Sequence, residues 1–311
     1  MRIVVTGGSG FIGSHLCERL LREGHEVVCL DSFITGSPEN TEPFLSNPRF
    51  SRIECDVSDG LPVEGTVDRI YHMASPASPV GYMKNPFVTL KVGSYATFHC
   101  CELARQNNAR VLVASTSEIY GDPLEHPQKE SYWGNVNSIG PRSVYDEAKR
   151  FAESVMMAYH TEYNVATRIV RIFNTYGPRM QLEDGRALPA FFSQALRNEP
   201  ITVFGDGSQT RSFCYVTDLV DGIIRLMESD YHLPVNIGNP VEITIREVVD
   251  EVLRITGSTS EVTYHPLPQD DPKLRRPDIT LARKVLGWEP KVDRAEGLEK
   301  TLAFFREMVV K

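Results

Sequence analysis

With 311 residues, 41% of them hydrophobic, the chain can bury a substantial core in one large or two medium domains. Its formal net charge of −8 argues against a nucleic-acid or membrane surface, where clustered positive charge is expected. No apolar run is long enough to span a bilayer, and the apolar start of the chain is too short for a signal peptide, so we expect a cytoplasmic protein.

The cysteines are expected to be reduced thiols that serve packing. They stand in apolar or strand-like segments and lack the spacing of metal ligands, so we predict neither disulfides nor a metal site. These residues are Cys17, Cys29, Cys55, Cys100, Cys101 and Cys214.

The first predicted unit is a buried strand over residues 2–6, a glycine-rich loop and a helix over residues 15–22. Glycines permit a tight turn that brings backbone N–H groups against a pyrophosphate at a helix N-terminus, where the helix dipole favours negative charge. The loop reads Gly7-Gly8-Ser9-Gly10-Phe11-Ile12-Gly13, and its candidate cofactor contacts are Gly7, Gly10, Phe11, Ile12 and Gly13.

A second strand, over residues 26–30, leads into Asp31. In dinucleotide-binding folds a carboxylate at this place binds a ribose 2′-hydroxyl. Because a carboxylate there would repel a 2′-phosphate, the sequence predicts NAD rather than NADP.

Strands are also predicted over 50–55, 69–73 and 110–114, with loops over 32–49 and 75–86 and a helix over 87–107. Strands alternating with helices predict an α/β fold, a Rossmann doubly wound parallel sheet. Ligands of such sheets bind beyond the carboxyl ends of the strands. Candidate cofactor contacts after these strands are Ser32, Thr35, Gly36, Asp56, Val57, Met73 and Ser75.

The run Ser143-Val144-Tyr145-Asp146-Glu147-Ala148-Lys149 holds a candidate base. If it is helical, Tyr145 and Lys149 leave the same face about one turn apart. An ammonium beside a phenol favours the phenolate, so Lys149 is expected to lower the pKa of Tyr145 toward neutrality and make it a general base.

Thr116, Tyr145 and Lys149 on a Rossmann scaffold resemble the catalytic triad of the extended short-chain dehydrogenases/reductases that act on nucleotide sugars. Other segments are similar to one branch of that family, the UDP-glucuronate decarboxylases or UDP-xylose synthases. The similarity runs from the first strand to Gly287-Trp288-Glu289-Pro290. Matching runs include Gly121-Asp122-Pro123-Leu124-Glu125-His126-Pro127, Tyr132-Trp133-Gly134-Asn135-Val136-Asn137, Gly140-Pro141-Arg142, Ile172-Phe173-Asn174-Thr175-Tyr176-Gly177-Pro178-Arg179-Met180, Asp184-Gly185-Arg186, Gln209-Thr210-Arg211-Ser212-Phe213, and Asp270-Asp271-Pro272 followed by Arg275-Arg276-Pro277-Asp278.

This resemblance implies NAD-dependent decarboxylation of UDP-glucuronate to UDP-xylose through a transient UDP-4-keto sugar. Tyr145 would take the proton of the C4 hydroxyl, Lys149 would hold the nicotinamide ribose, and Thr116 would share the C4 hydroxyl. The remaining implied contacts are Ser117 and Glu118 near C5 and C6, Arg275 at the carboxylate, Asn174, Arg186 and Arg211 at UDP, Thr175 at the cofactor, and Lys91 on the substrate side.

Two positions bear on the choice of reaction. Related sugar 4,6-dehydratases carry an aspartate where this chain has Ser117, and a serine is a poor acid for protonating a departing C6 hydroxyl. We also hypothesise that an ionised Glu118 repels the substrate carboxylate and so favours its loss as CO₂. Still open are a 4-epimerase, a 4,6-dehydratase, a decarboxylase that releases the UDP-4-keto pentose with NADH, and a redox-silent NAD-binding regulator.

Beyond Arg179, helices are predicted over 188–198 and 244–256, and a structured loop over 264–277 that carries Asp270, Asp271, Arg275 and Arg276. The resemblance implies a Rossmann domain over 1–178, with 211–228 returning to it, and a smaller interleaved substrate-binding α/β domain over most of 179–311. It also implies a symmetric homodimer through two Rossmann helices. One departure stands out, because the family commonly has Asn where this chain has Gly93.

Overall fold

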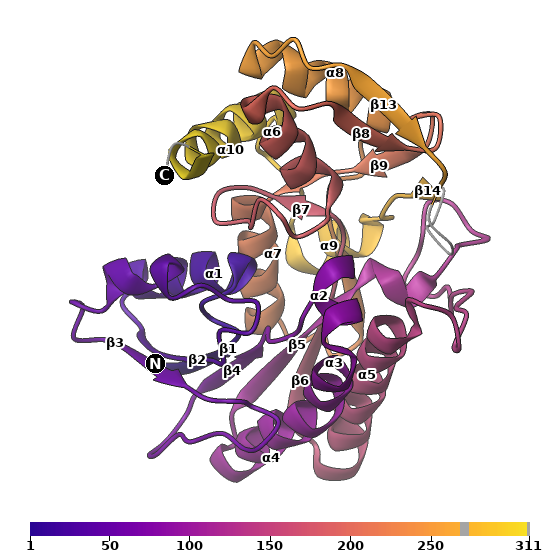
Figure 1. Ribbon diagram of the computed structural model, residues 1–311. Coiled ribbons are helices and arrows are strands. Elements are labelled where there is room, and N and C mark those ends of the chain that lie inside the picture. The colour runs from indigo at the N-terminus through magenta and orange to yellow at the C-terminus, as the bar shows by residue number, and fades with distance from the viewer. Residues whose placement is uncertain (268–273, 310–311) are drawn as a thin grey trace.

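The computed structural model describes residues 1–267 and 274–309, and its framework is a seven-stranded sheet (Figure 1). Every neighbouring pair of strands in this sheet runs parallel, in the order β11-β6-β5-β4-β1-β2-β3. The prediction of a doubly wound parallel sheet is therefore confirmed. The strands are β1 Arg2–Thr6, β2 Glu26–Asp31, β3 Phe50–Glu54, β4 Arg69–His72, β5 Arg110–Thr116, β6 Ala166–Ile172 and β11 Pro234–Ile237.

Helices cover both faces of the sheet, and the side chains of β1 are buried on both of these faces. Ile3 and Val5 belong to one buried cluster with residues of α1 and α7, whereas Val4 belongs to another with residues of α4 and α5. Side chains of a strand alternate between faces, so a strand buried on both reads as an unbroken apolar run. The helices are α1 Phe11–Arg22, α3 Pro86–Lys91, α4 Thr97–Asn107, α5 Ser143–Tyr163 and α7 Val216–Glu228, with a π-helical turn over Val92–Ala96.

After β6 the chain alternates between this sheet and a smaller lobe, drawn at the top of Figure 1. In that lobe β8 pairs with β13, and β9 lies between β12 and β14. The predicted helices over 188–198 and 244–256 appear as α6 and α8. The elements are β8 Ile201–Phe204, β9 Thr210–Ser212, β12 Glu242–Thr244, β13 Val262–His265, β14 Leu274–Arg275, α6 Ala187–Arg197, α8 Ile245–Thr256 and α10 Arg294–Val309.

The return of the chain to the large sheet extends past the predicted 211–228. Helix α7 packs against the sheet, β11 adds its seventh strand beside β6, and α9 (Thr280–Leu286) packs on β11 and α7. At the junction of the lobes, β7 (Thr175–Tyr176) pairs in parallel with β10 (Cys214–Tyr215).

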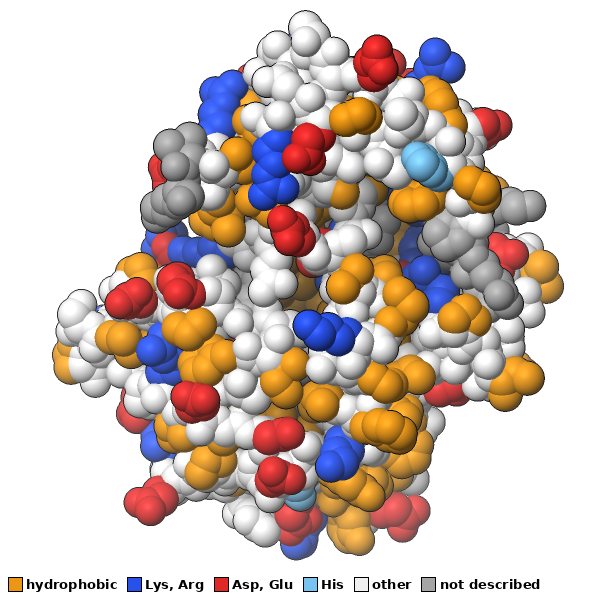
Figure 2. Space-filling view, in the orientation of Figure 1, with side chains coloured by type: hydrophobic (Ala, Val, Ile, Leu, Met, Phe, Trp, Pro, Cys, Tyr) orange, Lys and Arg blue, Asp and Glu red, His pale blue; other side chains and the backbone are white. Residues whose placement is uncertain are grey.

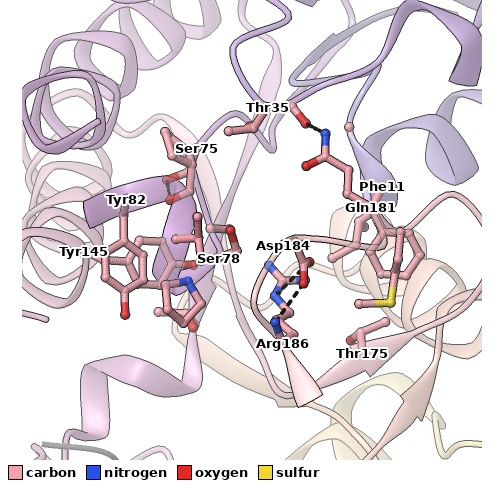
Figure 3. A pocket seen from close by; sticks show the side chains of 18 of the residues that line it. Phe11, Thr35, Ser75, Ser78, Tyr82, Tyr145, Thr175, Gln181, Asp184 and Arg186 are labelled. Atoms are coloured by element: carbon pink, nitrogen blue, oxygen red, sulfur yellow. Dashed lines mark hydrogen bonds and ion pairs between the residues drawn. The ribbon is translucent and has the colours of Figure 1, made fainter. Parts of the chain in front are cut away.

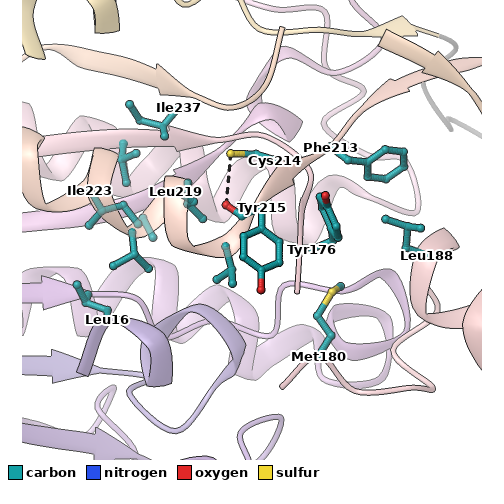
Figure 4. Packing of buried hydrophobic residues seen from close by; sticks show 14 of the residues in the cluster. Leu16, Tyr176, Met180, Leu188, Phe213, Cys214, Tyr215, Leu219, Ile223 and Ile237 are labelled. Atoms are coloured by element: carbon teal, nitrogen blue, oxygen red, sulfur yellow. Dashed lines mark hydrogen bonds between the residues drawn. The ribbon is translucent and has the colours of Figure 1, made fainter. Parts of the chain in front are cut away.

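One continuous apolar core joins the two lobes (Figure 4). It runs from Leu16 and Ile223, which cover the sheet, through Tyr176 and Tyr215 at the junction, to Leu188 at the start of α6. A Cβ placed on Gly297 of α10 would lie 2.2 Å from the Tyr176 hydroxyl. Helix α10 therefore lies directly against the junction. Such packing ties the lobes together through shared side chains.

The segment 75–86, expected to be a loop, contains the short helix α2 (Pro79–Lys84). Ser78 caps this helix by accepting a hydrogen bond from Gly81 N at 3.1 Å, and Pro79 stands at its first turn. Proline fits the first helical turn because its missing N–H has no partner there. The other short helices are η1 Pro38–Asn40, η2 Glu42–Phe44 and η4 Ser117–Tyr120. Among the described residues, none of the helices could cross a membrane.

Gly93 lies in the π-helical turn at a close contact with α5. A Cβ at Gly93 would lie 2.7 Å from both the Cβ and the backbone oxygen of Ala148. The glycine therefore lets the turn approach α5 next to Lys149, which accounts for its presence at this position.

Replacing Gly93 with Ala is expected to lower the free energy of unfolding by about 1–3 kcal/mol, the usual cost of overpacking a tight contact. Urea denaturation measures the change, and Ser94→Ala on the same turn is the control, expected to stay within about 0.5 kcal/mol of the parent. A Gly93→Ala protein as stable as the parent would contradict this account of the contact.

Candidate active site

A cavity of about 950 Å³ opens at the carboxyl ends of the sheet strands and is also lined by residues of the smaller lobe (Figure 3). All the predicted site residues line it except Lys91. Lys91 is exposed at the end of α3 and does not contribute to the lining. The structure thus gathers residues from 7 to 275 around one site, as expected of a sheet that binds ligands beyond its strand ends.

The glycine-rich loop forms a backbone cradle at the start of α1. Gly7 has φ +68, and a Cβ there would lie 2.7 Å from the backbone of Ala74. A Cβ at Gly13 would lie 2.0 Å from the backbone oxygen of Gly7. Gly10 is the N-cap residue of α1 and provides no side-chain cap, and the first residues of the helix, Phe11, Ile12 and Gly13, line the cavity. These features fit the pyrophosphate of a dinucleotide.

Asp31 ends β2 at the edge of the same cradle. Its Oδ2 accepts a hydrogen bond from Ser9 N and its Oδ1 accepts one from Phe33 N, each at 2.9 Å. Burial raises the pKa of this carboxyl, and the N–H groups of Phe33 and Ser9 oppose the rise. The carboxylate lines the cavity and fits the ribose of NAD, because a buried acceptor is satisfied by hydroxyl donors.

The Asp31→Asn variant is expected to raise the dissociation constant of NAD roughly tenfold, because a hydrogen bond to a charged group is lost while the shape is kept. Fluorescence titration with NAD measures the effect. Asp59→Asn, an exposed neighbour outside the cavity, is the control. Equal NAD affinities in the Asp31→Asn and Asp59→Asn proteins would contradict the role of Asp31.

The first turns of α5 bring Tyr145 and Lys149 together, as predicted, but their electrostatics differ from the prediction. The Lys149 ammonium lies 5.7 Å from the Tyr145 ring centre and donates a hydrogen bond to Ala114 O at 2.7 Å. Burial raises the pKa of Tyr145 to about 12, and a hydrogen bond with Thr116 only partly opposes this. Burial also lowers the pKa of Lys149 to about 8. The expectation that the pKa of Tyr145 lies near neutrality is therefore wrong for this structure, because burial disfavours the phenolate more than the hydrogen bond with Thr116 favours it.

Tyr82 of α2 is a site residue that the sequence analysis missed. Its ring stacks on that of Tyr145 with centres 5.1 Å apart and planes 8° apart (Figure 3). The contact covers one face of the Tyr145 ring and contributes to its burial. The proline-rich reading of residues 75–86 hid this residue, since it placed no helix there.

Thr116 ends β5 and begins the turn that presents Glu118. Its Oγ1 accepts a hydrogen bond from Glu118 N at 3.2 Å, and its hydroxyl also contacts Tyr145. The short helix η4 follows, with Ser117 buried at its start. The end of β5 and the turn that follows it place the side chains of Thr116, Ser117 and Glu118 along the wall of the cavity.

Two arginines hold Glu118. Arg142 Nη2 donates to Glu118 Oε2 at 2.6 Å, and Arg275 Nη1 donates to Glu118 Oε1. Burial disfavours the charge of Glu118, but Arg275 and Arg142 overcome it and hold its pKa at about 2. Arg142 was not predicted as a site residue. The hypothesis that Glu118 repels a substrate carboxylate needs correction, because the flanking guanidinium groups neutralise this charge.

A chain of backbone and amide contacts positions Arg275. Strand β14 pairs Arg275 with Arg211 of β9. Gln128, fully buried, donates from its N to Arg276 O at 2.9 Å and accepts from Arg276 N at 2.8 Å. Asn236 donates to Gln128 O at 3.0 Å. The carboxylate-side arginine is thus anchored by residues far away in sequence.

The expected UDP contacts also line the cavity. Asn174 and Arg211 line it, and Arg186 at the start of α6 pairs with Asp184 at 3.6 Å (Figure 3). Burial raises the pKa of Asp184 and Arg186 opposes this. Asp270 and Asp271, which belong to a matching motif, lie outside the described residues.

Comparison with known proteins places this geometry in a family. The family described as "NAD dependent epimerase/dehydratase family" matches residues 3–238. The chain belongs to that family. The NAD dependence in that description agrees with the glycine-rich cradle and with the acid at the end of β2.

Two curated relatives match all or nearly all of the chain. UDP-glucuronic acid decarboxylase 1 of Arabidopsis thaliana is 51% identical over 310 residues, which is 100% of this chain and 71% of that protein. UDP-glucuronic acid decarboxylase 1 of Danio rerio is 51% identical over 304 residues, 98% of this chain and 72% of that protein.

Among solved structures, the UDP-glucuronic acid 4-epimerase of Bacillus cereus, in complex with UDP-glucuronic acid and NAD, is similar with a TM-score of 0.87. It is 28% identical and the match covers 99% of this chain and 100% of that one. The fold of this chain thus matches that of a family member crystallised with both NAD and a UDP-uronic acid.

Proposed function

We infer that this chain is an NAD-dependent UDP-glucuronate decarboxylase that forms UDP-xylose. The observation that carries the inference is the paired guanidinium groups of Arg142 and Arg275 around Glu118, in the same cavity as Tyr145 and Thr116. A cationic cluster beside a general base suits a sugar that carries a carboxylate. The two relatives that are 51% identical over nearly the whole of this chain are named UDP-glucuronic acid decarboxylases, which supports the same substrate.

The chemistry explains why a hydride acceptor is required for a reaction with no net oxidation. A carboxylate on C5 of glucuronate has nowhere to send its electron pair until C4 becomes a carbonyl. Bound NAD supplies a reversible hydride acceptor at C4. The resulting β-keto acid loses CO₂ as the electron pair of the bond between C5 and the carboxylate moves into the C4 carbonyl, and C5 then gains a proton. Return of the hydride to C4 would reduce the ketone to the hydroxyl of UDP-xylose, which leaves no net oxidation.

The residues of this chain supply the proton transfers and orientation. Tyr145 takes the proton of the C4 hydroxyl and returns it at the end. Thr116 hydrogen-bonds Tyr145 and stabilises negative charge on the C4 oxygen. The positive charge of oxidised NAD would lower the pKa of Tyr145, which burial keeps at about 12 in this structure. Lys149 would hold the nicotinamide ribose.

A 4-epimerase acting on the same uronate is the second candidate, because a similar solved structure is an epimerase with UDP-glucuronic acid bound. The two reactions share the C4 ketone and differ in whether CO₂ leaves. Incubation with UDP-glucuronate, UDP-glucose and dTDP-glucose in parallel, followed by NMR of the sugars, separates them. We expect a pentose from the uronate alone. UDP-galacturonate, or turnover of a neutral sugar without the uronate, would contradict the assignment, and accumulation of NADH with a 4-keto pentose would indicate an incomplete cycle.

We also propose a homodimer formed through α4, α5 and the helical segment before them. Hydrophobic side chains gather over the lower right of the face in Figure 2, where Figure 1 places α3 and α5. Phe87 is 77% exposed, Tyr95 57% and Phe151 47%. Exposed apolar patches of this kind mark association surfaces.

We also propose a cytoplasmic location. The thiols of the described cysteines are unpaired, which suits a reducing compartment.

A charge placed on this patch is expected to separate the subunits. Phe98, 41% exposed, packs against Phe151 and Tyr159, so Phe98→Glu would bury a carboxylate between copies. Sedimentation velocity is expected to show a dimer for the parent and a monomer for Phe98→Glu. Leu45→Glu, at an equally exposed leucine outside this patch, is the control. A monomeric parent would contradict the proposal.

A further inference from the structure

The ring of Tyr82 lies flat against the ring of Tyr145 in the wall of the cavity. Their centres are 5.1 Å apart and their planes differ by 8° (Figure 3). Parallel rings at this separation are offset, which is a favoured arrangement of aromatic side chains. Tyr82 is 2% exposed and Tyr145 is 5% exposed, so the pair is buried. The side of the Tyr145 ring that faces α2 is therefore filled by a second ring.

Helix α2, which carries Tyr82, is held at both ends and from the side. Its N-terminus is capped by a side chain. At its C-terminus Asn85 Nδ2 donates a hydrogen bond to Gly81 O at 3.0 Å. Val80 lies against Gly185 of the loop before α6, where an added Cβ would come 2.5 Å from Val80 Cγ2. A side chain on a helix fixed in this way has a well-defined position from which to support a neighbour.

The phenol oxygen of Tyr145 has to be placed accurately. In the proposed reaction it takes the proton of the C4 hydroxyl, and in the structure it is hydrogen-bonded with Thr116. Proton transfer requires the two oxygens to lie within hydrogen-bond reach, and a misplacement of about 1 Å can slow a reaction roughly 100-fold. A ring that shifts carries its hydroxyl with it. A rigid neighbour that fills one side of the ring limits such a shift.

We propose that Tyr82 is a positioning residue for the base: its ring holds the ring of Tyr145 in the place where the phenol oxygen meets the C4 hydroxyl of the sugar. This inference rests on the proposed function, since it takes Tyr145 to be the base that acts on UDP-glucuronate. Tyr82 acts through its flat ring and not through its hydroxyl. Its effect on the rate therefore disappears when Tyr145 has no hydroxyl to place.

Two substitutions separate the ring of Tyr82 from its hydroxyl. Tyr82→Leu keeps an apolar side chain without the ring, and is expected to lower kcat for UDP-glucuronate roughly 10- to 100-fold. Tyr82→Phe keeps the stack and is expected to stay within about threefold of the parent kcat. In both variants KM is expected to change less than about threefold, because the lost support acts on the transition state. Steady-state kinetics, with kcat expressed per NAD-binding site counted by fluorescence titration, measure these changes.

A double-mutant cycle with Tyr145→Phe separates positioning from general support of the fold. Without the phenol hydroxyl, adding Tyr82→Leu is expected to lower the residual single-turnover rate by less than about twofold. A purely structural role would lower the residual rate by the same factor as in the parent, since independent effects multiply. NAD affinity reports whether each variant is folded. Tyr82→Met, which also lacks a ring, takes the place of Tyr82→Leu if the leucine protein does not bind NAD.

Tyr163→Leu is the matched control, because Tyr163 of α5 also packs against a tyrosine ring, that of Tyr159 at 5.5 Å, but outside the cavity. Its kcat is expected to equal that of the parent. Three results would each overturn the inference: a Tyr82→Leu protein with the parent kcat, a Tyr82→Phe protein as slow as Tyr82→Leu, or equal losses in both arms of the cycle. A parent that does not decarboxylate UDP-glucuronate would instead overturn the proposed function.

Discussion

Replacing Tyr145 with Phe is expected to slow UDP-glucuronate turnover by roughly 10²- to 10⁴-fold, the usual contribution of a general acid–base group. Only the hydroxyl is removed, so the ring is expected to keep its stacking on Tyr82, whose centre lies 5.1 Å away in the parent. Binding of NAD and of UDP-glucuronate is therefore expected to change little. Steady-state kinetics with UDP-glucuronate, together with the two dissociation constants, measure this separation of catalysis from binding.

Tyr159→Phe serves as the control, because Tyr159 lies on the same helix and packs against Phe98 outside the cavity. It is expected to retain full activity. If Tyr145→Phe turned over the uronate at the rate of Tyr159→Phe, the base would have to be another residue.

The second large effect is expected at Arg275. Arg275→Gln removes the cation assigned to the substrate carboxylate and leaves Glu118 with Arg142. Truncating one member of a buried charge pair costs about 2–5 kcal/mol. The transition state for UDP-glucuronate is expected to lose about that much stabilisation, which lowers kcat/KM. The affinity for UDP alone is expected to stay unchanged, since UDP carries no uronate carboxylate.

The neighbouring Arg276 provides a matched comparison. Its side chain is 40% exposed and lies 3.5 Å from Glu242, and the residue does not line the cavity. Arg276→Gln is expected to keep its activity on UDP-glucuronate. A loss of UDP affinity in Arg275→Gln as large as its loss of uronate turnover would mean that the arginine supports the whole site rather than the carboxylate.

The cofactor half of the site could be predicted from the sequence because its signals are local. The glycine loop and Asp31 belong to one strand-loop-helix-strand unit, and the required order and spacing are visible in the chain. The Tyr145–Lys149 pair was predictable for the same reason, since helix periodicity alone places the two side chains on one face.

The substrate half depends on contacts that local patterns do not record. Glu118 meets Arg142 from 24 positions away and Arg275 from 157, and Gln128 anchors Arg276 across 148. The resemblance identified Glu118 and Arg275 one by one, but not their pairing or the second arginine. The direction of the pKa shift of Tyr145 was not predicted, because the burial that raises this pKa is a property of the folded chain. Lys91 remains a predicted substrate contact that the structure places away from the cavity.

The most direct test of the central claim, a transient ketone at C4, uses UDP-glucuronate carrying deuterium at C4. Samples of a single turnover are quenched with borohydride at successive times and the sugars are analysed by NMR and mass spectrometry. The account predicts early sugars of both C4 configurations that have lost the deuterium, and a final pentose that has regained it at C4. Deuterium that stays at C4 in one configuration at every time, while CO₂ is released, would contradict it.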